Sequence, residues 1–185
     1  MIAPIGGHLV PFSPRWRVIS AIICSAHFEP ERIMPLDSTD RRMLAILQRE
    51  GRISNAALAE RLHLSPSPCL RRLRSLEHDG VIVGYRAVLD RLKLGLGLTV
   101  FAGLKVDRHS DENAAAISAA LRAAPEVISA HIVSGSADFR LEIVVADLAA
   151  YERLLFDTLL KLPHVTDVRS EFALRAAKSD GSLPL

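Results

Sequence analysis

Hydrophobic positions in the first half of the chain recur every three or four residues in three short runs, and this spacing predicts three helices. Residues that commonly cap helices precede each run: Asp37 or Ser38 before the first, Ser54 before the second and Ser65 before the third. The predicted inward-facing positions are Met43, Leu44, Ile46 and Leu47, then Leu58, Ala59 and Leu62, and finally Leu70, Leu73 and Leu76.

A short apolar segment follows the third run. Residues 81–89 are predicted to form a β-hairpin interrupted by Gly84. Three helices and a hairpin within about 55 residues make a winged helix-turn-helix, a fold that places one helix in a DNA groove.

The second half of the chain alternates between strand and helix patterns. The predicted elements are a strand (98–107), an alanine-rich helix (111–124), two strands (127–134 and 139–146), an amphipathic helix (147–162) and a last strand (165–174). The apolar positions of the second helix are Leu148, Tyr151, Leu154, Leu155, Leu159 and Leu162. This βαββαβ order is that of the ferredoxin-like split βαβ motif, so the predicted fold class is α+β.

These patterns divide the chain into five parts. They are an N-terminal segment (1–33), the winged helix-turn-helix (34–91), a hinge (92–97), the ferredoxin-like domain (98–178) and a tail (179–185). The first part holds four prolines and no sustained periodicity, so it is interpreted as a disordered extension or as a start assigned too early, with Met34 as the natural start. Its apolar stretch VISAIICSA imitates a signal peptide, but a DNA-binding domain directly downstream argues against that reading.

Composition indicates a globular protein, because 49% of the 185 residues are hydrophobic and 24% are charged. The net charge of +2 is too small to indicate a partner, but the distribution of charge along the chain is informative. Residues 34–91 hold ten arginines and no lysine against seven carboxylates, whereas residues 92–185 hold ten basic against twelve acidic residues. The excess of arginine is a weak indication of an anionic partner for the first domain.

Candidate enzyme chemistry is missing from the sequence. Cys24 and Cys69 have no zinc-ligand spacing, Cys69 is interpreted as a small packing residue, and the seven histidines are scattered. No nucleophile–base pair or phosphate-binding glycine loop is recognisable. No apolar run reaches the roughly 20 residues that span a bilayer. We therefore predict a cytoplasmic protein that is not an enzyme, with no cofactor, no metal and no membrane association.

The segment LSPSPCLRRLRSLEHDGVI, residues 64–82, contains the predicted third helix. If its leucines face the core, then Ser67, Arg71, Arg74 and His78 share another face, and Arg72 flanks it. Guanidinium groups bind guanine edges or phosphates, and the helix N-terminus with Ser65 can hold a phosphate. The alternative is an ordinary helical hairpin with a solvated arginine face.

Several motifs resemble one known family. LDSTD, GRISN, LAERLHLSPSPCLRRLRSLE and GVIVGYRAVLD resemble the N-terminal domain of the Lrp/AsnC (leucine-responsive/asparagine) regulators of bacteria and archaea. GSADF, YERLLFDTLLKLPHV and SEFAL resemble the effector-binding domain of that family. The resemblance extends from about Leu36 to Lys178.

The resemblance implies a DNA-binding regulator. It places the helix-turn-helix on residues 55–74 and implies homodimers that pair through their sheets and assemble into tetramers or octamers. The two reading helices of a dimer are then expected to enter successive major grooves, which lie about 34 Å apart in B-DNA. The residues implied to contact double-stranded DNA are Asn55, Ser65, Ser67, Pro68, Arg71, Arg72 and Arg74.

The resemblance also implies that a small effector, usually an amino acid, binds near the loop before the third strand, at contacts between dimers. The corresponding residues are Gly135, Ser136, Ala137, Asp138 and Phe139. The family more often has an acidic and an aromatic residue where Ser136 and Ala137 stand. Gly135 lets backbone approach a ligand, and Asp138 can pair with an α-ammonium group. The alternative is a structural turn in which Asp138 satisfies local N–H groups.

Two other classes compete with this one: an enzyme, and an amino-acid-binding protein that does not bind DNA. The second would leave the arginines of the third helix without a role. The predicted function is a sequence-specific transcriptional regulator of the Lrp/AsnC type that responds to an amino acid or a related metabolite.

Overall fold

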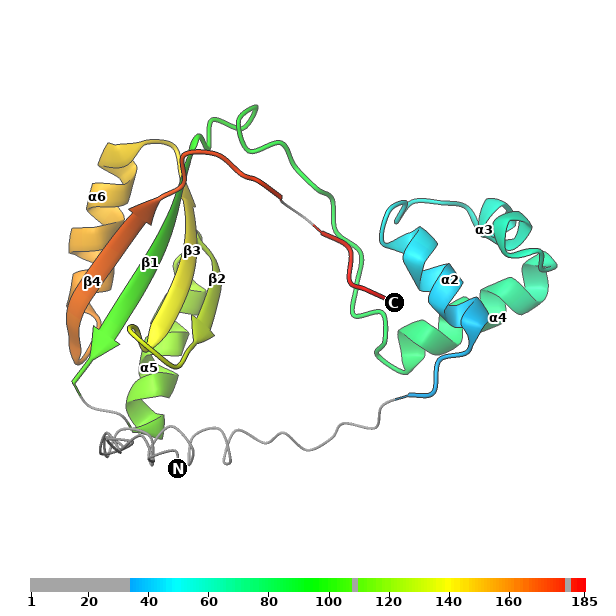
Figure 1. Cartoon of the computed structure of the whole chain (residues 1–185), viewed down its shortest axis with the longest axis horizontal. Coiled ribbons are helices and arrows are strands. Elements are labelled where there is room, and N and C mark those ends of the chain that lie inside the picture. Colours follow the sequence, from blue (N-terminus) through cyan, green and yellow to red (C-terminus); the bar gives the residue numbers. More distant parts are fainter. Residues whose placement is uncertain (1–33, 108–109, 179–180) are drawn as a thin grey trace, which may run out of the picture. The chain divides into compact units, whose positions relative to one another are not determined.

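The computed structural model describes residues 34–107, 110–178 and 181–185. Residues 1–33, which the sequence assigned to an extension or a misplaced start, lie outside the described residues. From Leu36 onward the chain contains a helical domain and a sheet domain (Figure 1), and each has its own cluster of buried hydrophobic residues.

Three helices form the first domain: α2 (Ser38–Leu47), α3 (Asn55–Leu62) and α4 (Pro66–His78). Asp37, not Ser38, caps α2, and it forms a reciprocal capping box with Asp40. The Ser54 hydroxyl caps α3 by accepting a hydrogen bond from the backbone N–H of Ala57. Ser65 stands at the start of α4 with Pro66 as the first helical residue. The predicted starts of the three helices are confirmed.

The core of this domain differs from the predicted one at α4. Cys69 and Leu76 are fully buried there and Leu73 packs against them, whereas Leu70 is only half-buried and lies outside the cluster. Residues 69, 73 and 76 follow the i, i+4, i+7 spacing of a single helical face, which the predicted leucine stripe missed by one residue. Cys69 is thus the packing residue that the sequence suggested, and burial raises the pKa of its thiol.

The predicted hairpin over residues 81–89 is wrong. Val81 and Ile82 pack on the helical core, but within the described chain no strand forms before residue 98. The side chains of Val83 and Val88 are 96% and 74% exposed, so the apolar residues beyond Ile82 have no core to cover. A hairpin needs a hydrophobic face that packs on something, and this segment has none within its own domain.

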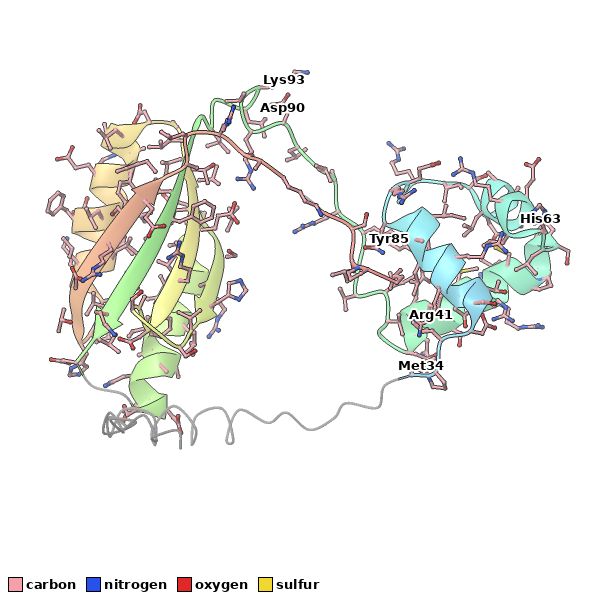
Figure 2. All side chains as sticks on the ribbon, in the orientation of Figure 1. Met34, Arg41, His63, Tyr85, Asp90 and Lys93 are labelled. Carbon is pink, nitrogen blue, oxygen red and sulfur yellow. The ribbon has the colours of Figure 1, made fainter. Side chains whose placement is uncertain are left out.

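Tyr85 holds the extended segment to the helices (Figure 2). Its hydroxyl donates a hydrogen bond to a Glu77 carboxylate oxygen at 3.0 Å, and its ring lies beside Gly51. Partial burial and the neighbouring Glu77 carboxylate raise the pKa of Tyr85 to about 12. Further along, the Asp90 carboxylate accepts the backbone N–H groups of Leu92 and Lys93 and fixes a turn ahead of the second domain.

The second domain is a four-stranded sheet with two helices. Its elements are β1 (Leu98–Val106), α5 (Asp111–Ala123), β2 (Val127–Ile132), β3 (Phe139–Val145), α6 (Leu148–Asp157), a 3-10 turn η1 (Leu159–Lys161) and β4 (Val165–Phe172). The strand order is β2-β3-β1-β4 and every neighbouring pair is antiparallel. This arrangement confirms the predicted ferredoxin-like βαββαβ fold.

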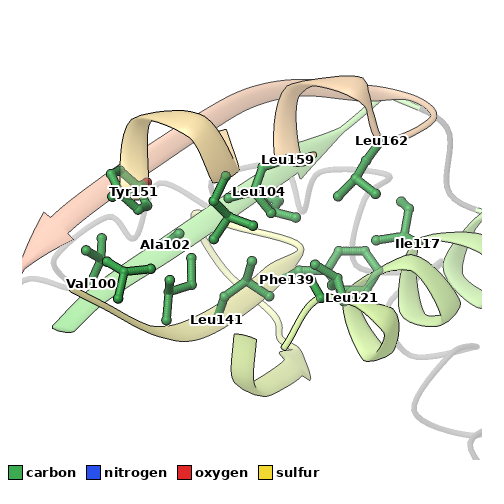
Figure 3. Packing of buried hydrophobic residues seen from close by; sticks show 14 of the residues in the cluster. Val100, Ala102, Leu104, Ile117, Leu121, Phe139, Leu141, Tyr151, Leu159 and Leu162 are labelled. Atoms are coloured by element: carbon green, nitrogen blue, oxygen red, sulfur yellow. The ribbon is translucent and has the colours of Figure 1, made fainter. Parts of the chain in front are cut away.

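Alternate residues of the two central strands form the core beneath the helices (Figure 3). Val100, Ala102 and Leu104 on β1 are completely buried, as the period of two in a strand requires. The buried Tyr151 of α6 shares a hydrogen bond with the Ser170 hydroxyl, which satisfies its polar group. The other core residues are Val106, Ile117, Leu121, Ala124, Phe139, Leu141, Ile143, Val145, Leu154, Leu159 and Leu162.

The predicted helix over 147–162 is shorter than expected. The α-helix ends at Asp157, and the 3-10 turn that follows buries Leu159. The tighter turn also brings Leu162 inward. Leu148, predicted to be part of the apolar stripe, is the first helical residue and is 60% exposed, outside the core that Tyr151 joins in the same turn.

Candidate DNA interface and effector loop

The outer side of α4 presents Arg71 and Arg74 to solvent, while Cys69 and Leu76 on its opposite side fix it in the core. Three positions apart, the two arginines are neighbours on one helical face. Among the residues that the structure describes, neither guanidinium has a carboxylate within 4.0 Å. Both cations are therefore free to meet an anionic partner.

The start of α4 leaves its hydroxyl groups unused. A capping side chain accepts a hydrogen bond from the second or third backbone N–H of the helix, and Pro68 at the third position has no N–H to donate. Ser65 is the N-cap residue but makes no side-chain capping bond. The Ser65 and Ser67 side chains are both exposed. These hydroxyls can therefore meet a partner such as a phosphate oxygen.

Two residues of the predicted DNA-contact set are instead bound within the domain. Arg72 Nη1 lies 2.7 Å from a carboxylate oxygen of Asp37 and 2.9 Å from one of Asp40. The Asn55 amide nitrogen donates to the carbonyl oxygen of Pro66 at 2.9 Å, and this bond joins the start of α3 to the start of α4. The other amide atom, Asn55 Oδ1, is buried and has no hydrogen-bond partner in the described part of the chain.

The ion pairs of this domain affect its acidic groups. A backbone N–H of Asp40 and the Arg72 guanidinium hold the pKa of Asp37 below its ordinary value. Arg61 lies 2.6 Å from Glu50 and lowers the pKa of Glu50 in the same way. Both carboxylates are therefore ionised at neutral pH, and the charges of Arg61 and Arg72 are compensated inside the domain.

The predicted effector loop is the turn between β2 and β3. Gly135 has φ +124°, a conformation that residues with a side chain rarely adopt. The Asp138 backbone N–H donates to the carbonyl of Leu104, and the Asp138 carboxylate accepts the backbone N–H of Val106 at 2.9 Å. Lys105 Nζ lies 3.7 Å from the other carboxylate oxygen. These contacts hold the loop against β1.

The five predicted effector residues differ in their exposure to solvent. Gly135 and Ser136 are exposed, Ala137 and Asp138 are half-buried, and the Phe139 side chain is buried in the core of the sheet domain. Asp138 satisfies a local N–H group, as in the structural-turn alternative, yet its side chain keeps 19% of its surface exposed. Because the Phe139 side chain is buried in the core, it is not accessible at the surface of the loop.

Sequence reasoning missed two residues beside this loop, Lys105 and Gly103. A Cβ atom added at Gly103 would lie 3.1 Å from the Cβ of Ala137, so the loop packs directly on the backbone of β1. More than thirty positions separate each residue from its neighbour in the loop, and no local spacing could reveal the contact. The strand register brings them together.

A surface hollow of about 450 Å³ lies elsewhere in the same domain, between the C-terminal ends of α5 and α6. Pro125, Arg153 and Asp157 are among the residues that line it, and none of the predicted effector residues does.

Within the described ranges no helix is long and apolar enough to cross a membrane. No group of three metal-ligating side chains is found among the same residues.

Comparisons with known proteins match each of the two domains. Residues 36–83 match the family described as winged helix-turn-helix DNA-binding, and residues 99–183 match the Lrp/AsnC ligand binding domain. The leucine-responsive regulatory protein of Salmonella typhimurium is 40% identical over 148 residues, which are 80% of this chain and 90% of that protein. This chain belongs to the Lrp/AsnC family. The Haemophilus influenzae protein of the same name is 40% identical over 157 residues, 85% of this chain and 95% of the relative.

Solved structures of other Lrp/AsnC proteins have the same fold. A transcriptional regulator from Neisseria meningitidis, solved in complex with L-Met, has a TM-score of 0.77 and 39% identity, and the match covers 80% of this chain and 96% of that one. An AsnC family regulator from Agrobacterium tumefaciens also has a TM-score of 0.77, with 36% identity over 80% and 97% of the two chains. This protein is therefore a DNA-binding transcription regulator with a ligand-binding domain.

Proposed function

We propose that this Lrp/AsnC regulator reads DNA with the outer face of α4, and that an amino acid or related metabolite bound at residues 135–138 changes how tightly it does so. The observation that carries the first half is that Arg71 and Arg74 are exposed on a helix anchored in the core, and that no carboxylate of the described residues pairs with them. Their forks match guanine edges and phosphate oxygens.

The start of the helix supports the same surface. Ser65, Ser67 and Pro68 are small, and the two hydroxyls are not used for capping, so the helix end can approach a duplex closely. A homodimer, assembled further into a higher oligomer, would present two such helices to successive major grooves about 34 Å apart. Such a protein would act in the cytoplasm, where bacterial and archaeal DNA is accessible.

The test uses Arg71→Ala and Arg74→Ala in the full chain. The probe is a duplex that the unaltered protein has selected from a random pool, titrated by fluorescence anisotropy at several salt concentrations. An arginine that reads a base should cost about 1–3 kcal/mol, with relaxed specificity at one position. An arginine that touches phosphate should lower the salt slope by about one, uniformly across sequences.

Arg122→Ala is the matched control, because it removes an exposed arginine from α5 in the other domain and changes the net charge equally. Its affinity and salt slope should stay close to those of the unaltered protein. Unchanged DNA binding by both α4 variants would disprove the proposed reading face.

The proposed effector site rests on the loop that Asp138 anchors. Its carboxylate already accepts the Val106 N–H, and an α-ammonium group could pair with the remaining exposed oxygen surface. The exposed backbone at Gly135 and the Ser136 hydroxyl could take the ligand carboxylate. The L-Met complex of the Neisseria meningitidis relative makes methionine the first ligand to test.

Calorimetry against the twenty amino acids tests this site with two variants. Asp138→Asn keeps an oxygen for the Val106 N–H but removes the charge, whereas Asp138→Ala removes both. A ligand bound through its ammonium group should lose affinity in both variants. The bound ligand should shift DNA affinity by a coupling free energy of about 1–3 kcal/mol. If no amino acid binds, or if Asp138→Asn binds as well as the unaltered chain, the loop is a structural turn.

A further inference from the structure

We propose that Arg72 is a positioning residue, which clamps the reading helix α4 to the start of α2 and does not itself contact DNA. The inference rests on the proposed function, in which α4 reads DNA. It assigns a different role to a residue that the family resemblance placed among the DNA contacts.

The geometry of the clamp involves three charged groups on two helices. Arg72 Nη1 donates to Asp37 at 2.7 Å and to Asp40 at 2.9 Å. These carboxylates are the capping box of α2: the Asp37 carboxylate accepts the backbone N–H of Asp40 at 2.8 Å, and the Asp40 carboxylate accepts that of Asp37. One guanidinium nitrogen therefore ties the middle of α4 to the group that begins α2.

Partial burial and charge both oppose the movement of Arg72 from Asp37 and Asp40 to a DNA phosphate. The Asp40 side chain is 16% exposed and that of Arg72 is 38% exposed, so the network is partly shielded from water. If Arg72 turned to a phosphate, Asp37 and Asp40 would face each other without their shared cation, beside the negatively charged duplex. The two carboxylates lie 2.7 Å and 2.9 Å from the same guanidinium nitrogen, so without it two like charges remain close together and repel, and a nearby polyanion adds to that repulsion.

The direction of Arg72 on the helix is consistent with this role. Successive helical residues are about 100° apart, so Arg71 and Arg74 lie about 60° from each other, while Arg72 lies about 100° from the first and about 160° from the second. Arg71 and Arg74 are exposed, whereas Arg72 is half-buried against α2. Free and clamped arginines thus occupy different sides of α4.

A second bond restrains the same helix at its start, since the Asn55 amide donates to the Pro66 carbonyl from the first residue of α3. Asn55 and Arg72 together connect α4 to both other helices of the domain. The orientation of Arg71 and Arg74 then depends on hydrogen bonds that Asn55 and Arg72 make within the domain. Loss of the clamp should weaken DNA binding through a less well oriented helix.

The experiment measures the DNA dissociation constant against KCl concentration for Arg72→Ala, Arg72→Lys and Asp40→Asn, with the selected duplex and the full chain. Binding should weaken about two- to tenfold in Arg72→Ala, as expected for a partly exposed ion-pair network, with the salt slope unchanged. Arg72→Lys should recover part of the affinity. Asp40→Asn should also weaken binding, although it removes a negative charge from a DNA-binding domain.

Three outcomes distinguish the alternatives. A salt slope that falls by about one in Arg72→Ala, together with tighter binding by Asp40→Asn, would mean that Arg72 contacts phosphate and would overturn the clamp. Wild-type affinity in both Arg72→Ala and Asp40→Asn would overturn it as well. Unchanged binding in Arg71→Ala and Arg74→Ala would instead contradict the proposed function, whatever the Arg72 variants do.

Folding is controlled by circular dichroism at the binding temperature, where each variant must be fully folded. Should Arg72→Ala fail this check, Arg72→Lys and Asp40→Asn carry the test, because each keeps a hydrogen-bonding group at its position. The charge exchange Arg72→Asp with Asp40→Arg should bind DNA more tightly than Arg72→Asp alone if the clamp is the function of the pair. Equal affinity of these two variants would refute it.

Discussion

His63 ends α3 in the left-handed conformation, with φ 55° and ψ 43°, at the turn before α4 (Figure 2). A residue with a Cβ atom is strained there by about 1–2 kcal/mol, and glycine is the usual occupant of such a C-terminal position. The sequence runs directly from one helix into the next, so the strain follows from how short the turn is.

His63→Gly should raise the free energy of unfolding by about 0.5–1 kcal/mol, the strain relieved minus the larger entropy that glycine loses on folding. Urea denaturation followed by circular dichroism measures the change. His78→Gly is the matched control, because the last residue of α4 has helical geometry and glycine there should destabilise by up to about 1 kcal/mol. A decrease in stability in both variants would show that His63 is not strained.

Asp37 gives a second prediction at the scale of one residue. Its pKa is lowered in the folded protein by the Asp40 N–H and by Arg72, so the ionised form stabilises the fold at pH values above the unfolded pKa of about 3.9. This contribution should disappear as pH falls through the lowered folded pKa. Asp37→Asn should lower stability at pH 7 and make stability less dependent on pH between about 5 and 2. Denaturation curves at several pH values in that range measure the free energy of unfolding of both proteins. The same pH dependence in Asp37→Asn and in the unaltered protein would contradict this prediction.

At the scale of the element, the contact between β1 and the effector loop depends on the missing side chain of Gly103. Its position opposite Ala137 leaves only 3.1 Å for an added Cβ atom. A larger residue would displace the loop from the strand and stretch the bond between Val106 and Asp138. The loop geometry is therefore set by β1 as much as by its own sequence.

Gly103→Val should destabilise the sheet domain by about 1–3 kcal/mol through overpacking. Ala137→Gly in the same chain should recover part of that loss, since the two sites are in contact and couple. Gly97→Ala serves as the control just before β1, because its added Cβ would meet only the Ala146 carbonyl at an ordinary 3.6 Å. Urea unfolding is measured for the unaltered protein, for the three single variants Gly103→Val, Ala137→Gly and Gly97→Ala, and for the double variant. Additive effects of Gly103→Val and Ala137→Gly would show that the contact is not formed.

At the scale of the whole molecule, the two hydrophobic clusters share no residue. Met43 is fully buried in the helical cluster, and Leu104 is fully buried in the sheet cluster. Disrupting the packing of one cluster therefore removes no side chain that belongs to the other cluster. Stability is then a property of each domain rather than of the described chain as a unit.

Met43→Ala and Leu104→Ala should each cost about 2–5 kcal/mol, as large-to-small changes in a core do, but in different domains. Differential scanning calorimetry should show two transitions, and each variant should lower the midpoint of one of them. In the double variant the losses should add within about 0.5 kcal/mol. One transition that both substitutions shift equally would mean that the domains unfold together.

The sequence by itself determined the three helices of the first domain and the order of strands and helices in the second, although it predicted a hairpin over residues 81–89 that does not form. Apolar spacing, Ser54, Ser65 and Pro66 located the three helices, and the βαββαβ pattern predicted the ferredoxin-like domain, because both signals depend on residues within a few positions of each other. Residue motifs also pointed to the family that the comparisons confirmed.

Only the tertiary structure decided which predicted site residues are available to a partner. Arg71 and Arg72 are adjacent and chemically identical, yet one is exposed and the other is bound to Asp37, 35 positions away. Phe139 turns into the core beside Asp138, and the chain after Ile82 forms no hairpin, with Val83 and Val88 exposed. These outcomes depend on contacts between residues distant in the chain, and local periodicity carries no information about such contacts.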